Sequence, residues 1–256
     1  MLNLSPAPRH RRGIFLLPNL FTTAALFAGF YAIVAAMGGR FEAASVAIIV
    51  AIVLDGVDGR VARITHTESA FGATYDSLSD MVAFGLAPAL VVYEWSLVSL
   101  GKPGWLAAFI FTASAALRLA RFTVQLDVAD KRYFQGLPSP SAAALLAVLV
   151  WLGVDYGFSG ERVAVPVSLA TILTGVLMVS NIRYYSLKEF DWKGRVPFVF
   201  ALVIVLVFVM ISINPPLVLF SGFLIYAISG PGLTLFQVRK RREARKSAGD
   251  APSKKP

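Results

Sequence analysis

Runs of about twenty apolar residues recur along the chain, separated by short polar segments. An α-helix rises about 1.5 Å per residue, so roughly 20 apolar residues are needed to cross the hydrocarbon core of a bilayer. The pattern therefore predicts an all-α polytopic membrane protein with about eight transmembrane helices. We expect these helices at residues 16–37, 41–61, 73–98, 105–122, 141–158, 163–181, 196–213 and 216–238.

The composition agrees with membrane embedding. Hydrophobic residues make up 57% of the 256 residues, the mean hydropathy is +0.68 and 15% of the residues are charged, which is too apolar for an ordinary soluble domain. The absence of cysteine excludes disulfides and thiol chemistry. A net charge of +9 could suit nucleic acid, but the basic residues flank apolar segments, so we expect no nucleic-acid partner.

The distribution of basic residues predicts the orientation. Eight spans place both termini on one side of the membrane, and all but three of the 24 Lys and Arg residues lie on that side. The exceptions are Arg40, Lys102 and Arg162. Because loops rich in Lys and Arg remain in the cytoplasm, both termini are expected there. The first apolar run, from residue 14 to 37, is too long for the hydrophobic part of a secretory signal, so we retain it as a span.

Four aspartates stand at the ends of two of these apolar segments, namely Asp55, Asp58, Asp76 and Asp80. Residues three or four positions apart share a helix face, so two adjacent helices would present a four-carboxylate cluster. An ionised aspartate at the centre of a membrane helix costs roughly 2.5 to 3.5 kcal/mol on insertion scales. The cluster therefore requires a compensating cation.

Two kinds of cation could provide that compensation. Arg60 and Arg63 lie in the same stretch, but they neutralise at most two of the four charges. Carboxylate oxygens suit hard divalent ions, and four carboxylates can hold two ions. We therefore expect a divalent metal site of Mg²⁺ or Mn²⁺ with two ions, held by Asp55, Asp58, Asp76 and Asp80.

The residues that follow the first aspartate pair indicate what kind of ligand could bind beside the metal. Gly59 and Ala62 remove side-chain bulk from nearly the same helix face as the first aspartate pair, and Arg63 offers a planar donor fork that suits phosphate. The stretch resembles the signature of the CDP-alcohol phosphotransferase family. At the expected spacing, the fixed positions of that signature are occupied here by Asp55, Asp58, Gly59, Ala62, Arg63, Gly72, Asp76 and Asp80.

The resemblance implies a six-helix catalytic core, a homodimer, and transfer of a phosphatidyl group from CDP-diacylglycerol to an alcohol with release of CMP. It implies that Asp80 is the catalytic base, while the other aspartates act chiefly as metal ligands. It also implies contacts to CDP-diacylglycerol from Gly59, Arg63 and Ser69, and from Asn19 and Thr22 near the start of the first span. Ala25 stands where many relatives carry Asn, so no contact is expected from that position.

The acceptor alcohol is indicated by a second region. Arg118 and Arg121 share a helix face, where they could contact lipid phosphate or bind a carboxylate or phosphate of the acceptor. The segments LRLARF and FQGLPSPSAAA, with LPNLFTTAALFAGFYA in the first span, resemble the bacterial phosphatidylserine synthase branch of the family. This resemblance implies L-serine as acceptor and a bacterial inner-membrane location. His66 is interpreted as a solvated loop residue rather than a covalent nucleophile, so we expect direct displacement.

The sequence also allows other acceptors and two other classes of membrane protein. Glycerol 3-phosphate or an inositol phosphate could replace serine as the acceptor. An intramembrane prenyltransferase also uses Asp-rich helix ends, although it would need a second such motif in the later spans. An ion-coupled transporter also carries intramembrane carboxylates, but we find neither an inverted repeat nor matched broken helices.

The chain is expected to form a single membrane-embedded catalytic domain over residues 1–238. It would comprise a basic cytoplasmic N-terminus (1–13), a six-helix core (14–182) and two additional helices (196–238). Residues 239–256 are basic and poor in apolar side chains, which predicts a disordered cytoplasmic tail that contacts anionic membrane lipid.

Overall fold

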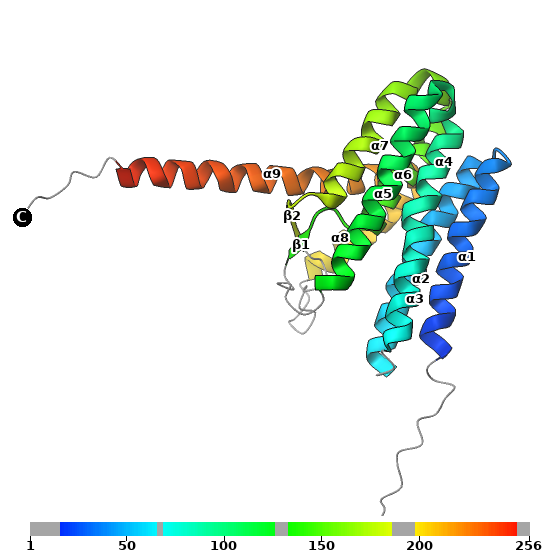
Figure 1. Cartoon of the computed structure of the whole chain (residues 1–256), viewed down its shortest axis with the longest axis horizontal. Helices are drawn as coiled ribbons and strands as arrows, with labels where there is room; N and C mark the ends of the chain where they lie inside the picture. Colours follow the sequence, from blue (N-terminus) through cyan, green and yellow to red (C-terminus); the bar gives the residue numbers. More distant parts are fainter. Residues whose placement is uncertain (1–15, 66–68, 126–132, 186–197, 250–256) are drawn as a thin grey trace, which may run out of the picture.

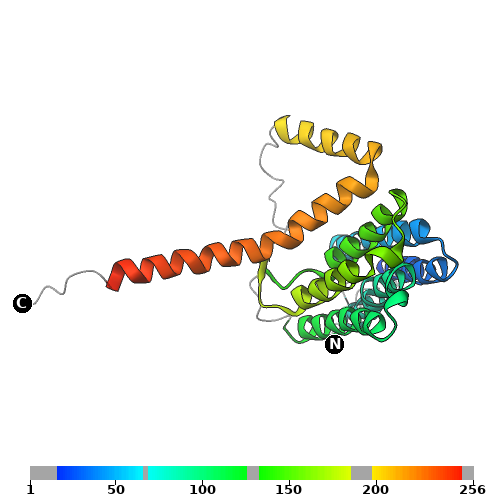
Figure 2. The same ribbon diagram turned by 90° about the horizontal axis from the view of Figure 1, so that it is seen from above.

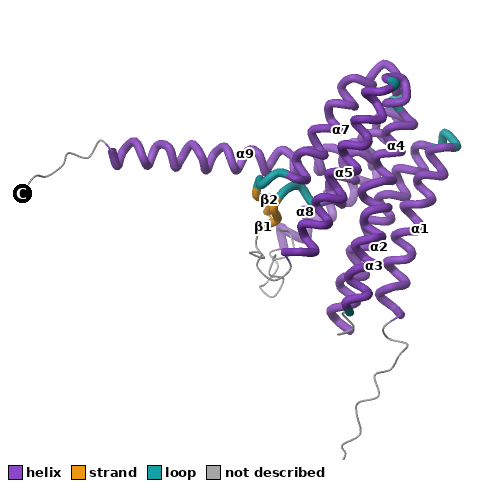
Figure 3. Tube along the Cα trace, viewed as in Figure 1, coloured by secondary structure: helices purple, strands orange, loops and turns teal. Residues whose placement is uncertain are grey.

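Helices account for most of the structure, a computed structural model that describes residues 16–65, 69–125, 133–185 and 198–249 (Figures 1 and 3). The prediction of an all-α polytopic protein is confirmed, and each of the eight predicted segments contains a helix. The helices are α1 (Leu16–Met37), α2 (Phe41–Thr65), α3 (Ala70–Asp80), α4 (Ala87–Trp95), α5 (Lys102–Gln125), α6 (Ser139–Asp155), α7 (Ala164–Val179), α8 (Phe198–Ile213) and α9 (Pro215–Gly249).

A π-helical segment, η1 (Met81–Leu86), joins α3 to α4, so these three elements form one rod from Ala70 to Trp95. Short 3₁₀ turns, η2 (Leu97–Leu100) and η3 (Gly160–Val163), precede α5 and α7. Because π-helical turns occur frequently at functional sites, the position of η1 directly after Asp80 draws attention to that residue. The sequence pattern did not predict this segment.

A two-stranded antiparallel sheet lies outside the helical pattern. Strand β1 (Tyr133–Gln135) pairs with β2 (Arg183–Tyr185), and Gln135 stands opposite Arg183. Gly136 follows β1 with φ of +75°, and a Cβ there would lie 2.1 Å from the carbonyl oxygen of Met178. Only glycine fits both the backbone conformation and the space.

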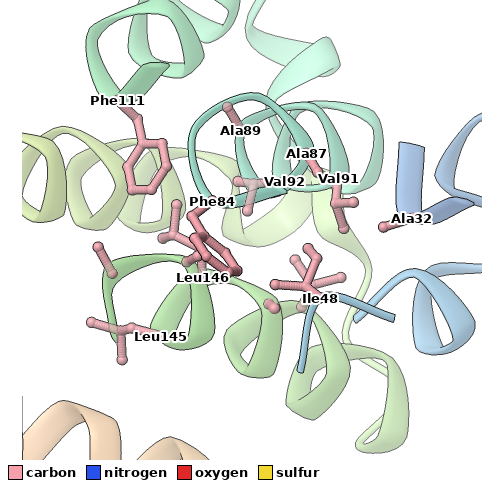
Figure 4. Close-up of a cluster of buried hydrophobic side chains, with 14 of the residues drawn as sticks. Ala32, Ile48, Phe84, Ala87, Ala89, Val91, Val92, Phe111, Leu145 and Leu146 are labelled. Carbon is pink, nitrogen blue, oxygen red and sulfur yellow. The ribbon is translucent and has the colours of Figure 1, made fainter. Parts of the chain in front are cut away.

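Small residues allow the first helices to pack closely. α1 and α2 pack against each other, and both carry buried alanines, including Ala32, Ala36, Ala44 and Ala51. Such small residues let helix backbones approach in membrane proteins. Larger side chains fill the space between α2, η1, α4, α5 and α6, where Ile48, Phe84, Val92, Phe111 and Leu146 form part of one buried cluster (Figure 4).

The outer surface of the bundle is strongly apolar. Large exposed side chains include Phe27, Phe30, Leu117 and Leu169, as expected of helices that face lipid. Among the described residues, five helical rods are long and apolar enough to cross a membrane: 18–37, 70–95, 102–124, 160–179 and 215–234. The helix α6 is apolar but shorter.

The C-terminal pair is arranged differently from the other helices. In Figures 1 and 2, α9 runs across the axis of the bundle and projects away from it, and α8 packs against α9. The predicted disordered tail is wrong up to Gly249, because α9 continues to that residue. Its basic segment contains Arg, Lys, Glu and Ala, which all favour helix formation. Residues 250–256 lie outside the described residues.

Candidate active site

Three of the four aspartates gather at one place. Asp55 comes from α2, and Asp76 and Asp80 stand one turn apart near the end of α3. One carboxylate oxygen of each residue lies within 4.8 Å of those of the other two, and the three side chains are partly exposed. Three acidic groups at this separation repel one another unless a proton or a cation compensates them.

Asp58 lies beside this cluster and is more deeply buried. It is 5% exposed, and its Oδ2 accepts a hydrogen bond of 2.8 Å from the hydroxyl of Thr22 in α1. Its charge acts on Asp80, as do the charges of Asp55 and Asp76. The structure therefore places Asp58 next to the three clustered aspartates, with its carboxylate oriented by Thr22.

The donor set fits a divalent metal. Its ligand atoms are carboxylate oxygens only, which suits a hard cation. Asp55 also lies at hydrogen-bonding distance from Asp80, and two ionised carboxylates cannot make that contact without a proton or a cation between them. The residues that could hold such an ion are therefore Asp55, Asp76 and Asp80, with Asp58 adjacent.

Hydrogen bonds join α1 to α3 beside the aspartates. The hydroxyl of Ser79 donates to the carbonyl of Thr22 at 3.1 Å, and Thr23 and Tyr75 share a hydrogen bond of 2.9 Å between their hydroxyls. Ser79 immediately precedes Asp80, the last residue of α3. Its hydrogen bond to α1 therefore fixes the direction in which the Asp80 side chain projects from α3. The sequence pattern did not indicate Ser79, Thr23 or Tyr75.

The residues expected to contact the nucleotide lie around the start of α3. Ser69 caps this helix by accepting a hydrogen bond of 3.0 Å from the backbone N–H of Gly72. A Cβ on Gly72 would stand 3.1 Å from the Ser69 hydroxyl and 3.5 Å from Oδ1 of Asn19. Asn19 and Ser69 therefore converge on Gly72. Ala25 is buried, and His66 lies outside the described residues.

Open space adjoins α2 next to the aspartates. A Cβ built on Gly59 would meet no atom within 4 Å, and the side chain of Arg63 is exposed. A ligand could therefore approach the backbone at Gly59 while the guanidinium of Arg63 remains available to a phosphate. Arg60 is also exposed.

The two arginines of α5 have different surroundings. Arg118 is 5% exposed and donates to the carbonyls of Gln135 at 2.9 Å and Met178 at 3.3 Å, while its guanidinium lies 4.6 Å from the centre of the Phe122 ring. It thus joins α5 to β1 and to the end of α7. Main-chain carbonyls already engage its guanidinium.

Arg121 lies one turn further along α5 and is partly exposed. It donates to Oε1 of Gln135 and, at 2.9 Å, to Oδ1 of Asn181. Both partners are exposed neutral amides. A negatively charged group of the acceptor could replace one of them as the hydrogen-bond partner of Arg121, or bind to Arg121 in addition to them. Gln135 lies within the FQGLP segment that carried the resemblance, whereas no pattern in the sequence indicated Asn181.

Comparisons with known proteins agree with this site. Residues 15–180 match the family model of the CDP-alcohol phosphatidyltransferases. A Helicobacter pylori protein named CDP-diacylglycerol–serine O-phosphatidyltransferase is 37% identical over 218 residues, which cover 85% of this chain and 90% of that protein. A Mycobacterium tuberculosis protein of the same name is 37% identical over 182 residues, or 68% of this chain and 63% of that protein.

A third relative with this name, from Methanocaldococcus jannaschii, is 40% identical over 137 residues, which cover 54% of this chain and 61% of that protein. The family model spans more than half of the chain and contains all four aspartates. This chain therefore belongs to the CDP-alcohol phosphatidyltransferase family.

Proposed function

We propose that this protein is a CDP-diacylglycerol–serine O-phosphatidyltransferase, which joins the phosphatidyl group of CDP-diacylglycerol to L-serine and releases CMP. The observation that carries the proposal is the convergence of Asp55, Asp76 and Asp80 in a chain that is 37% identical, over 85% of its length, to a protein named for this reaction.

The metal is proposed to be Mg²⁺ or Mn²⁺, with two ions held by Asp55, Asp58, Asp76 and Asp80. All-carboxylate ligation and partial exposure support these ions over softer metals. When bound, such ions neutralise the pyrophosphate and stabilise the departing oxygen. Thr22 supports this role by fixing the carboxylate of Asp58 through the 2.8 Å hydrogen bond.

Asp80 is proposed to be the general base. The hydroxyl proton of serine passes to the Asp80 carboxylate while the serine oxygen attacks the lipid-side phosphorus. As the new P–O bond forms, the bond from that phosphorus to the bridging oxygen breaks, and CMP leaves with the electron pair. No covalent enzyme intermediate is required.

The nucleotide part of CDP-diacylglycerol is proposed to bind between α1 and the loop before α3. Asn19 and Ser69 offer polar groups that converge on Gly72, and Thr22, which is buried, follows Asn19 by three residues in α1. The open face at Gly59 allows close approach of the pyrophosphate, and Arg63 supplies the donor fork. Each contact is a proposal that rests on the family signature and this geometry.

Serine is proposed to bind through its carboxylate at Arg121. This side chain already engages two neutral amide oxygens, and a charge-assisted bond to a carboxylate is stronger than a bond to an amide. Arg118 is proposed to hold β1 in place rather than to contact serine, because it is buried and bonded to two carbonyls.

We propose that the protein lies in the bacterial inner membrane with its aspartate end toward the cytoplasm. The ends of α2 and α5 that carry the aspartates and Arg121 lie at the same end of the bundle (Figure 1). Most Lys and Arg residues are expected on that side of the membrane, which is therefore the cytoplasmic side. A water-soluble acceptor and a lipid-linked donor could both reach a site at this depth. A homodimer is proposed on the family resemblance alone.

An acceptor screen tests the function. Purified protein would be given CDP-diacylglycerol and Mg²⁺ or Mn²⁺ with L-serine, glycerol 3-phosphate or an inositol phosphate, and the lipid product would be identified by mass. We expect phosphatidylserine and an equal amount of CMP with serine alone. A product from another acceptor would replace serine in the proposal. Absence of CMP release with every acceptor would refute transferase activity and reopen the prenyltransferase and transporter alternatives.

A further inference from the structure

The C-terminal helix α9 lies beyond the residues matched by the family model, yet it is fastened to the small sheet. Tyr184 of β2 is fully buried, and its hydroxyl donates a hydrogen bond of 2.9 Å to the carbonyl of Ala227 in α9. The Tyr226 ring lies 5.6 Å from the Tyr184 ring, centre to centre. Tyr184 therefore connects β2 to α9.

The sequence of α9 explains why this carbonyl accepts the tyrosine. Pro231 lies inside the helix, four residues after Ala227. Proline has no N–H, so the helical hydrogen bond that would reach the Ala227 carbonyl is missing. A buried carbonyl without a donor is costly, and the Tyr184 hydroxyl supplies one.

Gly230 provides the space for the tyrosine ring. A Cβ at this position would lie 2.4 Å from Cζ of Tyr184 and 2.5 Å from Cε1, so any side chain there would displace the ring. Two residues further on, a Cβ on Gly232 would meet nothing within 4 Å. The pair Gly230 and Pro231 thus forms a notch in α9 that accepts Tyr184.

Burial also keeps the tyrosine in its donor form. It raises the pKa of Tyr184 to about 12, and the neighbouring Tyr226 adds to the effect. The hydroxyl therefore carries its proton across the physiological range, and the bond to Ala227 does not depend on pH there.

The sheet transmits this contact to the arginines of α5. Tyr184 stands opposite Phe134, and Arg183 stands opposite Gln135. Gln135 accepts from Arg118 through its carbonyl and from Arg121 through its side chain. A pair of three-residue strands is too short to be stable alone, so its position depends on what it packs against.

We propose that the Tyr184 latch, comprising Tyr184, Ala227, Gly230 and Pro231, positions Gln135 and thereby Arg121 for acceptor binding. Tyr184 and Gly230 are positioning residues that never touch the substrates. The proposal deepens the proposed function and rests on it, because it assigns the acceptor subsite to Arg121. It gives α9 a role in the reaction although the helix lies outside the six-helix core.

A matched pair of glycine substitutions in the full-length protein tests the latch. Gly230→Ala forces the Tyr184 ring out of its notch, whereas Gly232→Ala makes the same change in the same helix with open space around it. Small displacements of a binding group can cost large factors in rate. We expect Gly230→Ala to raise the KM for serine about tenfold, while the KM for CDP-diacylglycerol stays within about twofold. Gly232→Ala should match the wild type.

Tyr184→Phe keeps the ring and removes only the hydroxyl, so it remains informative if Gly230→Ala does not fold. It should raise the serine KM by about threefold, as expected for loss of one hydrogen bond. The latch is overturned if the serine KM is unchanged in the variants that fold, or if the KM values of both substrates rise by the same factor.

The wild-type protein separates this test from that of the proposed function. If wild-type protein makes no phosphatidylserine but uses another acceptor, the proposed acceptor fails, and the same variants are then assayed with the true acceptor. A selective rise in the KM for that acceptor would support the latch. An unchanged KM would refute the latch independently of the acceptor's identity.

Discussion

Two sets of glycines at opposite ends of the bundle have opposite kinds of surroundings. At the end away from the aspartates, a Cβ on Gly160 or Gly104 would lie 1.9 Å from a backbone carbonyl oxygen, and one on Gly153 would lie 2.3 Å from the Trp95 ring. Beside the aspartates, a Cβ on Gly56 or Gly59 would meet no atom within 4 Å. The turns around Gly104 and Gly160 are filled by the protein itself, whereas the face of α2 at Gly59 has room for a ligand.

The comparison separates stability from function. The ordered turns at the tightly packed glycines are held by contacts such as the hydrogen bond of 2.7 Å from Ser96 to the carbonyl of Gly160. Beside the aspartates, the crowded carboxylates repel one another unless a metal ion or a proton compensates them, and the space at Gly59 leaves room for a ligand. We therefore expect substitutions at the tightly packed glycines to affect folding, and substitutions at the aspartates and at Gly59 to affect turnover.

The largest effect on turnover is expected for Asp80→Asn. An amide cannot take the serine proton, and loss of a general base typically lowers rates by about 10² to 10⁴. Synthesis of phosphatidylserine should fall to background while the protein stays folded and still binds CDP-diacylglycerol. Asp155→Asn, at an exposed position at the other end of the bundle, is the matched control and should retain activity. Appreciable turnover by Asp80→Asn would remove Asp80 from the role of base.

The largest effect on stability is expected for Gly160→Ala. The new methyl group would overlap the carbonyl of Trp95 and disturb the contact with Ser96. Overpacking of this kind costs about 1 to 3 kcal/mol or more. Thermal unfolding in detergent should show a clearly lower Tm and a reduced yield. A variant as stable as wild type would contradict the view that this end is tightly packed.

Gly59→Ala should show the reverse behaviour. Alanine in a helix interior is favoured over glycine by about 0.5 to 1 kcal/mol, and nothing in the structure obstructs the methyl group, so the Tm should be equal or higher. Activity should fall because the methyl group occupies the face proposed for the pyrophosphate. Gly222→Ala, at an exposed position of α9 where a Cβ would also meet no atom within 4 Å, is the control. If both variants were fully active, Gly59 would not border the nucleotide site.

The smallest effect is expected for Arg121→Ala. It should raise the KM for serine by roughly tenfold, as expected for loss of one charge-assisted hydrogen bond. The KM for CDP-diacylglycerol should change less. Steady-state kinetics with each substrate varied in turn would measure the difference. Serine kinetics identical to those of the wild type would assign Arg121 a purely structural role.

The sequence predicted those parts of the fold and site that depend on periodicity and charge. Apolar segment lengths predicted the helices, and the cost of buried charge predicted that Asp55, Asp58, Asp76 and Asp80 would lie together around a cation. The structure groups Asp55, Asp76 and Asp80, with Asp58 beside them. The prediction failed for residues 239–249, where helix propensity outweighs the lack of apolar residues.

The remaining features depend on contacts between distant segments. The strands β1 and β2 are three residues long and separated by 47 residues, so neither shows the alternation that identifies a strand. The Arg121 contact with Asn181 and the Tyr184 contact with Ala227 likewise join residues distant in sequence. Pro231 signals a missing helical hydrogen bond, but its position cannot show which side chain replaces it.

The most direct test of the account is to titrate the purified protein with Mn²⁺ and to measure the concentration of free Mn²⁺ by electron paramagnetic resonance. Wild-type protein should take up Mn²⁺ saturably, and Asp76→Asn should bind it much more weakly while remaining folded, because the cluster loses one of its carboxylates. Equal Mn²⁺ uptake by both proteins, or none by the wild type, would contradict the claim that these aspartates form a metal-dependent transferase centre.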